Sequence, residues 1–174
     1  MSERAEKWCV HAGPGRWPDA DMLPFGAVRQ CGAALPPDRW TKFTQDEQRT
    51  LMTLWCMMRS PLMMGGELTK CDAFTLSLLT NAGVLEIQKQ SFCAHPLRTT
   101  DTEAVWIAPR KDGRGAYIAV FNLSDEERRI TVLPEETETA AGRAVELWTG
   151  DSYRTLSADL RPHACAVWLA ETVS

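Results

Sequence analysis

The stretch GPGRWPDADMLPFG, residues 13–26, decides how the first half of the chain is interpreted. Three glycines and three prolines fall within it, so a helix cannot run through these residues, and we predict an irregular loop. Working outward on the N-terminal side, residues 3–8 predict the end of a helix and the apolar stretch 9–12 predicts a short strand. On the C-terminal side the loop is expected to continue through residue 42, with a Pro-Pro pair in its middle.

A strong helix signal follows this loop. Thr44 is a good N-cap residue, and Glu47 three positions later completes a capping box. The apolar face of the helix has helical spacing and consists of Leu51, Leu54, Trp55 and Met58. Pro61 is expected to end the helix, because proline disfavours helical geometry in the residue before it.

The next segment predicts another strand and another helix. Residues 61–66 (PLMMGG) predict a short buried strand that stops at the two glycines. Asp72 is a plausible N-cap for a second helix, which Asn81 and Gly83 are expected to end. This helix is expected to be partly buried through its apolar side chains, Phe74, Leu76, Leu78 and Leu79. The order strand, loop, helix, strand, helix is typical of parallel β/α units.

From about residue 93 the pattern changes to short β-runs separated by turns. The predicted strands are 104–110, 116–123, 128–133, 143–147, 153–156 and 164–170. Turn signals lie between them, for example Asp112-Gly113 and Gly150-Asp151. We therefore predict an α+β chain, with a β/α region at residues 1–90 and a small antiparallel β-sandwich at 91–174.

Length and charge exclude several classes of protein. The chain has 174 residues, whereas a complete (β/α)8 barrel needs roughly 200–250. The net charge is −4 and no basic stripe is visible, which argues against a nucleic-acid partner. No apolar run reaches the roughly 18 residues of a membrane span. The polar start MSERAEK does not resemble a signal peptide, so we expect a cytoplasmic protein.

The six cysteines are widely and irregularly spaced, without a CxxC pair, and the three histidines are scattered. Zinc sites need ligands at short, paired spacing, so no metal site is predicted. We interpret the cysteines as buried, reduced thiols.

Several segments together resemble one family. GPGRWPDADML resembles a segment of the family 27 glycoside hydrolases, which include the α-galactosidases and α-N-acetylgalactosaminidases. Residues 41–68 and 75–87 resemble that family's seventh helix and eighth strand and its eighth helix. AYIAVFNLSDEE, VELWTG and LRPHACAVWLA resemble its C-terminal β-domain. The resemblance covers nearly the whole chain, with all segments in the family's order.

This resemblance implies the last units of a (β/α)8 barrel followed by a sandwich. Retaining glycosidases use two carboxylates about 5 Å apart, and in the family both lie before the segment that this chain matches. We therefore expect no catalytic residue here and no activity from this chain alone. No metal or organic cofactor is implied. Lys70-Cys71-Asp72 imitates the family's K-x-D motif, but its position favours an N-cap role for Asp72.

The resemblance also suggests binding residues. Asp21 and Met22 match the Asp-Met pair that lines the family's sugar pocket. Trp17 and Asp19 match the same loop and are expected to shape it, Trp17 by packing and Asp19 by bonding backbone donors. Without the resemblance, a rigid turn with caps is the better explanation of the loop; with it, a sugar-binding role for Asp21 explains the loop equally well. Arg16 places a large cation at the mouth of the site, which leaves the identity of the sugar open.

Three hypotheses follow. The first is a fragment of an α-galactosidase-like hydrolase, which would bind α-galactoside-type carbohydrate once its site is completed. Such a fragment would leave apolar helix faces uncovered, so we expect it to form a homo-oligomer through residues 43–80 or to rearrange in this region. A complementing upstream fragment is the other expected partner. The second is a non-catalytic carbohydrate- or protein-binding module, which exposed aromatics on the sandwich would favour. The candidates are Trp106, Trp148, Tyr153 and Trp168, for which a core position is the simpler interpretation. The third is a chain with no function of its own.

Overall fold

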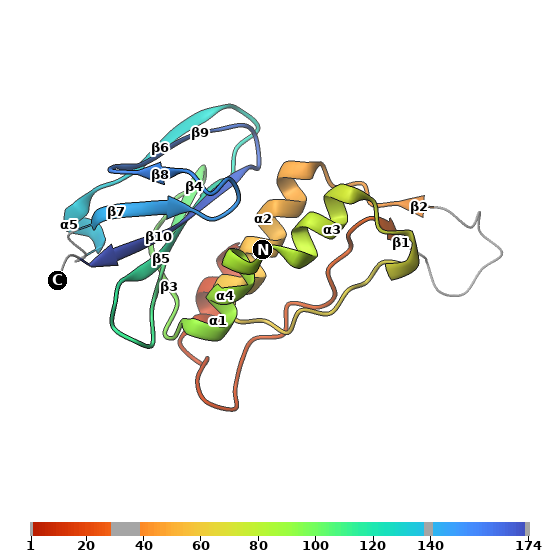
Figure 1. The fold of residues 1–174 in the computed structure, drawn as a ribbon, viewed down its shortest axis with the longest axis horizontal. Helices are drawn as coiled ribbons and strands as arrows, with labels where there is room; N and C mark the ends of the chain where they lie inside the picture. Colours follow the sequence, from red (N-terminus) through yellow and green to blue (C-terminus); the bar gives the residue numbers. More distant parts are fainter. Residues whose placement is uncertain (1, 29–38, 138–140, 173–174) are drawn as a thin grey trace.

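The computed structural model describes residues 2–28, 39–137 and 141–172 and consists of a helical part beside a β-sandwich (Figure 1). Cys31 and most of the segment expected to continue the loop lie outside these residues. The helical part contains α1 (Ser2–Cys9), β1 (Ala27–Val28), β2 (Arg39–Trp40), α2 (Gln45–Met58), the 3-10 helix η1 (Leu68–Lys70), α3 (Ala73–Thr80) and α4 (Ala82–Gln90).

The second part contains the longer strands. They are β3 (His95–Thr99), β4 (Glu103–Pro109), β5 (Ala116–Asn122), β6 (Arg128–Val132), β7 (Ala141–Glu146), β8 (Ser152–Tyr153), β9 (Leu156–Leu160) and β10 (Cys165–Thr172), with the short helix α5 (Pro134–Thr137) between β6 and β7. The mixed α+β fold class predicted from the sequence is therefore confirmed.

Helix α2 begins as predicted. The Glu47 amide donates to Thr44 Oγ1 over 3.2 Å and the Thr44 amide donates to Glu47 Oε2 over 2.7 Å, which is a complete capping box. The helix ends at Arg59, whose φ of 58° lies in the left-handed region. Its apolar face lies against α4 and the sheet: Leu54, Trp55 and Met58 are buried. The expectation that this face would be uncovered is wrong, because elements within the chain cover it.

The second predicted helix is divided in two. Asp72 is the N-cap of α3, and its carboxylate accepts from the Thr75 amide over 2.7 Å. Asn81 ends α3 and also caps α4, so the chain bends and continues as a helix beyond Gly83. Leu78 is buried, whereas Leu76 is exposed.

Two short strands predicted in the helical part are absent. Cys9 ends α1, and Val10 and His11 form a turn, so residues 9–12 are not a strand. Residues 61–66 form only single-residue bridges, a parallel one between Leu23 and Met64 and an antiparallel one between Val28 and Gly66. An apolar stretch becomes a strand only beside a partner strand, and within the described residues these segments have little or none.

The main sheet is antiparallel, with six strands in the order β3-β4-β5-β10-β7-β8. The last strand in the sequence, β10, therefore lies in the middle of the sheet, between β5 and β7. A second sheet of two strands, β6 and β9, covers one face of the first. One predicted strand needed correction: in residues 153–156, Tyr153 ends β8 and Leu156 begins β9. In addition, β3 was not predicted.

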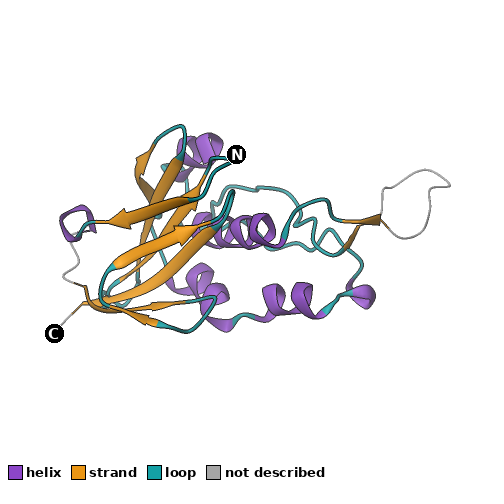
Figure 2. Cartoon of the chain, turned by 90° about the horizontal axis from the view of Figure 1, so that it is seen from above, coloured by secondary structure: helices purple, strands orange, loops and turns teal. Residues whose placement is uncertain are grey.

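The central strands of the six-stranded sheet are buried on both faces. On β5, Ile118 and Val120 contribute to the core shared with β6 and β9, whereas Tyr117, Ala119 and Phe121 belong to the core shared with the helices. Figure 1 shows α2 and α4 on one side of the sheet and the β6–β9 pair on the other, and Figure 2 shows from above the helices gathered beside the strands. Successive residues of β5 point to opposite faces of the sheet and thus contribute to two different hydrophobic cores.

The aromatic side chains of the sandwich are largely internal. Trp106 points into the core with the helices and Trp168 into the core with β6 and β9, and both are buried. Trp148 and Tyr153 are half-buried. The sandwich therefore does not present these four aromatics as the open face that a binding module would use.

Polar contacts join α2 to the sandwich. Thr50 Oγ1 donates to the carbonyl of His163 over 2.7 Å, and Trp148 Nε1 donates to Thr53 Oγ1 over 3.0 Å. The Thr53 hydroxyl also lies 3.4 Å from Cys165 Sγ. Because these groups are largely shielded from water, leaving any of them unpaired would destabilise the fold.

The five described cysteines are free, but they are not all buried. Cys56 is buried and Cys93 is exposed, so the expectation of buried thiols is confirmed for the first and wrong for the second. Burial raises the pKa of the Cys56 thiol to about 12 and that of Cys165 to about 11. These two groups stay protonated in the physiological range.

We predict that iodoacetamide at pH 8 modifies Cys93 but spares Cys56 and Cys165 in the folded chain. The thiolate is the reactive form, and a pKa of about 12 leaves on the order of one Cys56 thiol in 10,000 ionised at pH 8. Peptide mass spectrometry after brief labelling provides the measurement, with urea-unfolded protein as the control. Equal labelling of Cys56 and Cys93 before unfolding would contradict the burial described here.

We also predict that Thr44→Ala lowers the free energy of unfolding by about 1 kcal/mol, because the first turn of α2 loses its capping hydroxyl. Urea denaturation followed by circular dichroism measures the change. Thr155→Ala, at an exposed position between β8 and β9, is the matched control and should change stability by less than about 0.5 kcal/mol. Similar losses in both variants would mean that the cap does not contribute.

Candidate functional site

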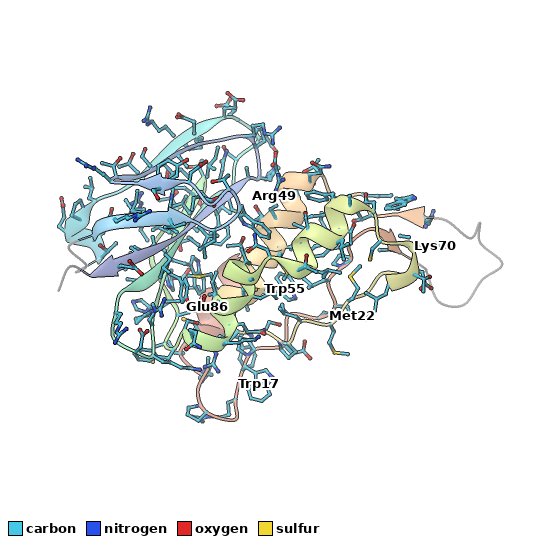
Figure 3. The ribbon with its side chains drawn as sticks, in the orientation of Figure 1. Trp17, Met22, Arg49, Trp55, Lys70 and Glu86 are labelled. Carbon is cyan, nitrogen blue, oxygen red and sulfur yellow. The ribbon has the colours of Figure 1, made fainter. Side chains whose placement is uncertain are left out.

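The loop of residues 13–22 follows α1 and is held in place by α2 and the segment after it. Trp55 Nε1 donates to the carbonyl of Asp21 over 2.9 Å, and the amide of Ala20 donates to Ser60 Oγ over 2.9 Å. Directly after the loop, the amide of Leu23 donates to the carbonyl of Met63 over 2.7 Å. Figure 3 shows Trp55 within the helical part, with Trp17 at the projecting end of the loop.

The first half of the loop closes on itself. The amide of Gly13 donates to the carbonyl of Arg16 over 2.7 Å, and the amide of Arg16 donates back to Gly13 over 2.9 Å. Gly15, between them, has a φ of 72°, which glycine adopts without the steric cost of a Cβ. This tight turn fixes the position of Arg16 and of Trp17 next to it.

The second half of the loop is shaped by its two carboxylates. Asp19 Oδ1 accepts from the amide of Asp21 over 2.9 Å, and Asp21 Oδ1 accepts from the amide of Met22 over 2.7 Å. Asp21 has a φ of 71°, a left-handed conformation that aspartate tolerates better than most residues. The role expected for Asp19, bonding a backbone donor in this turn, matches this geometry.

A cavity of about 940 Å³ lies between α1 and this loop. Its lining comes from α1 and the turn after it, the loop, and α2: Ala5, Trp8, His11, Gly15, Arg16, Trp17, Pro18, Asp19, Ala20, Asp21 and Met58. Three of the four predicted site residues, Trp17, Asp19 and Asp21, therefore share one cavity. Met22 is not part of the lining; its side chain is 53% exposed and lies beside Gly65.

Trp17 does not pack into the fold as expected, since 54% of it is exposed. Sequence reasoning also missed two residues of the lining, Trp8 and His11, whose rings contact edge to face with centroids 5.7 Å apart. Their spacing of three residues near the end of a helix is a signal that they share one face. The sequence carries no signal that this face would meet the loop.

The K-x-D motif lies outside this cavity. Asp72 caps α3, and hydrogen bonds from Thr75 lower the pKa of its carboxyl group. This supports the interpretation of Asp72 as a structural residue.

Metal binding and membrane insertion can be checked on the same residues. Within the described part of the chain, no three His, Cys, Asp or Glu side chains gather closely enough to hold a metal ion. Across the ranges 2–28, 39–137 and 141–172, no helix combines the length and the apolarity that a membrane span requires.

Two family models match the chain. The one described as Alpha galactosidase A matches residues 1–90, and the one described as Alpha galactosidase C-terminal beta sandwich domain matches residues 100–170. An alpha-galactosidase of Oryza sativa subsp. japonica is 25% identical over 180 residues, which is 97% of this chain and 40% of that protein. Alpha-galactosidase D of Emericella nidulans is 32% identical over 172 residues, 93% of this chain and 24% of that protein.

Solved structures give a similar result. The crystal structure of a GH27 β-L-arabinopyranosidase from Geobacillus stearothermophilus matches with a TM-score of 0.86 and 38% identity. The match covers 99% of this chain and 41% of that one. A variant of the same enzyme, solved in complex with arabinose, matches with a TM-score of 0.85. The chain thus spans about two fifths or less of each of these proteins.

The close approach of Gly66 to the segment after the loop leads to a prediction. A Cβ on Gly66 would lie 2.2 Å from the carbonyl oxygen of Phe25 and 2.9 Å from that of Ala27, and backbone atoms cannot move aside cheaply. We expect Gly66→Ala to lower the free energy of unfolding by about 2–3 kcal/mol and to speed proteolysis within residues 13–26.

Thermal unfolding and limited trypsin digestion provide the two measurements. Gly113→Ala is the matched control: nothing lies within 4 Å of its Cβ position, and only the strain of its φ of 71° applies, about 1 kcal/mol. A Gly66→Ala variant no less stable than the control would show that the bridge between these segments is not a tight constraint.

Proposed function

The chain belongs to the alpha-galactosidase family, glycoside hydrolase family 27, and from this we propose that it supplies part of the sugar-binding site of a retaining glycoside hydrolase. In the complete enzyme the reaction would be hydrolysis of terminal α-linked galactose-type sugars. The relatives support this substrate class, because they are named as alpha-galactosidases and a β-L-arabinopyranosidase. A β-L-arabinopyranoside has the ring configuration of an α-D-galactopyranoside and lacks only the C6 hydroxymethyl group.

The observation that carries the proposal is the fixed loop of residues 13–22. The hydrogen bonds from Trp55 and to Ser60 hold it against α2, and they place Asp21 on the wall of a cavity large enough for a saccharide. We assign Asp21 to accept hydrogen bonds from sugar hydroxyls. Met22 would contact the sugar ring from the rim, and Asp19 would keep the turn in shape. With more than half of its surface exposed, Trp17 is free to contact a ligand as well.

The chemical step needs more than this chain offers. Retaining hydrolysis requires a nucleophile and an acid/base carboxylate about 5 Å apart. In the cavity, Asp19 and Asp21 each have one oxygen occupied by a backbone amide, which suits positioning rather than nucleophilic attack. We therefore propose that a complementing barrel segment supplies both catalytic carboxylates, and that the chain alone is inactive. No cofactor is needed for chemistry carried by carboxylates.

The non-catalytic binding module is the second candidate. Its support comes from the helical part, where the indoles of Trp8 and Trp17 are 57% and 54% exposed beside the same cavity. In that case the loop, and not the sandwich, would hold the carbohydrate or protein ligand.

We also propose a cytoplasmic location and self-association of the chain. The location is supported by the free cysteines, which a reducing compartment would maintain. The apolar face of α2 is covered within the chain and is therefore not available for self-association through residues 43–80. Self-association is supported instead by exposed apolar side chains in this region, namely Phe43, Met63, Leu68 and Leu76.

We predict that the purified chain does not hydrolyse p-nitrophenyl α-D-galactopyranoside or p-nitrophenyl β-L-arabinopyranoside. Adding the part of the Geobacillus enzyme that precedes its matched region should restore turnover. In the reconstituted enzyme, Asp21→Asn should lower kcat/KM about 10- to 100-fold, as expected for the loss of a charged hydrogen-bond acceptor. The readout is release of p-nitrophenol.

Asp151→Asn, the same change at an exposed turn of the sandwich, is the matched control and should leave kcat/KM unchanged. Turnover by the chain alone would contradict the proposal, because the chain would then hold its own catalytic carboxylates. Equal effects of the two Asn variants would remove Asp21 from the sugar site.

A further inference from the structure

Arg16 places a guanidinium group in the cavity without a partner. Within the part of the chain that the structure describes, its side chain forms no ion pair or hydrogen bond, although its backbone is fixed by the turn with Gly13. Its Nη2 atom lies 3.7 Å from the point that a Cβ on Gly13 would occupy, so the guanidinium folds back over this glycine. The fixed backbone thus presents this charge at the cavity wall.

Several other arginines are paired with carboxylates. Arg110 Nη2 lies 2.7 Å from Asp112 Oδ2, and Arg161 Nη2 lies 2.9 Å from Asp46 Oδ2. The two carboxylates in the cavity, Asp19 and Asp21, instead accept backbone amides. The loop therefore uses its own acids to hold its shape and leaves its cation available.

Two indoles accompany this cation. Trp8 and Trp17 line the same cavity and expose more than half of their surface. An exposed indole offers a broad apolar face, which suits the C–H face of a pyranose ring, and its N–H can still donate to a hydroxyl. A planar guanidinium offers two parallel N–H donors, which match the two oxygens of a carboxylate.

We propose that the cavity recognises a galactose-type sugar that carries a carboxylate at C6, a galacturonide, and that Arg16 is its specificity-determining residue. The inference rests on the proposed function and deepens it. The ring hydroxyls meet Asp21, the ring face lies on Trp17, and the C6 carboxylate accepts two hydrogen bonds from the guanidinium of Arg16. Three sugars that differ only in the substituent on C5 thus become distinguishable: the arabinopyranoside with hydrogen, the galactoside with hydroxymethyl and the galacturonide with carboxylate.

Saturation-transfer NMR with the full chain at pH 7 and low salt tests whether the galacturonide binds more tightly than the other two sugars. The probes are methyl β-L-arabinopyranoside, methyl α-D-galactopyranoside and methyl α-D-galacturonide. We expect the galacturonide to bind about tenfold more tightly than the galactoside. We also expect 0.5 M NaCl to reduce that preference, because salt screens an exposed ion pair.

Variants assign the preference to one residue. Arg16→Gln should bring the galacturonide to the affinity of the galactoside, and Arg16→Lys should keep part of the preference, because an ammonium group keeps the charge but loses the paired donors. Arg154→Gln, the same charge change at an exposed position between β8 and β9, should keep the full preference. Circular dichroism of each variant confirms that it is folded.

Equal binding of the three sugars overturns the assignment, and so does a preference that persists in Arg16→Gln or a failure of the galacturonide to bind. None of these results touches the hydrolysis restored by the complementing segment, which tests the proposed function separately. If turnover is restored and the acid preference is absent, the hydrolase proposal stands and the role of Arg16 does not.

Discussion

The hydrogen bond from the Trp55 indole to the carbonyl of Asp21 is the contact on which the candidate site depends. A loop rich in glycine and proline has no ladder of its own hydrogen bonds, so its shape is set by partners outside it. Trp55 belongs to α2, a largely buried helix that is also bonded to the sandwich through Thr50 and Thr53. The loop and the sandwich are therefore both hydrogen-bonded to α2, so a change in the position of α2 would affect both.

The charged side chains of the loop differ in what they contact. The carboxylates of Asp19 and Asp21 stabilise a backbone that includes a left-handed aspartate, and each keeps a second oxygen for other partners. Arg16 has only its backbone committed. A short polar segment can thus hold its own shape and still present groups of both signs to a ligand. This combination suits sugars, whose hydroxyls donate and accept.

What could be predicted from the sequence was mostly local. The capping box of α2 and the N-cap at Asp72 depend on residues three positions apart, and both formed as expected. The strands predicted at residues 9–12 and 61–66 depend on partners elsewhere in space, and they did not form. The same distinction applies to the site. Trp17, Asp19 and Asp21 are neighbours in sequence and were found together, whereas Trp8 and Met58 reach the cavity only through the packing of α1 and α2.

The place of β10 in the sheet has a consequence for the order of folding. β10 comes later in the sequence than β5 and β7, the two strands that it joins. During synthesis, β3, β4 and β5 can pair as local hairpins, and so can β7 and β8, but the two halves meet only when residues 165–172 have left the ribosome. Until then β5 exposes an unpaired edge and two apolar faces, a surface prone to aggregation. Closure of the sheet, and with it the contact of α2 with β10, is therefore a late event in the folding of the chain.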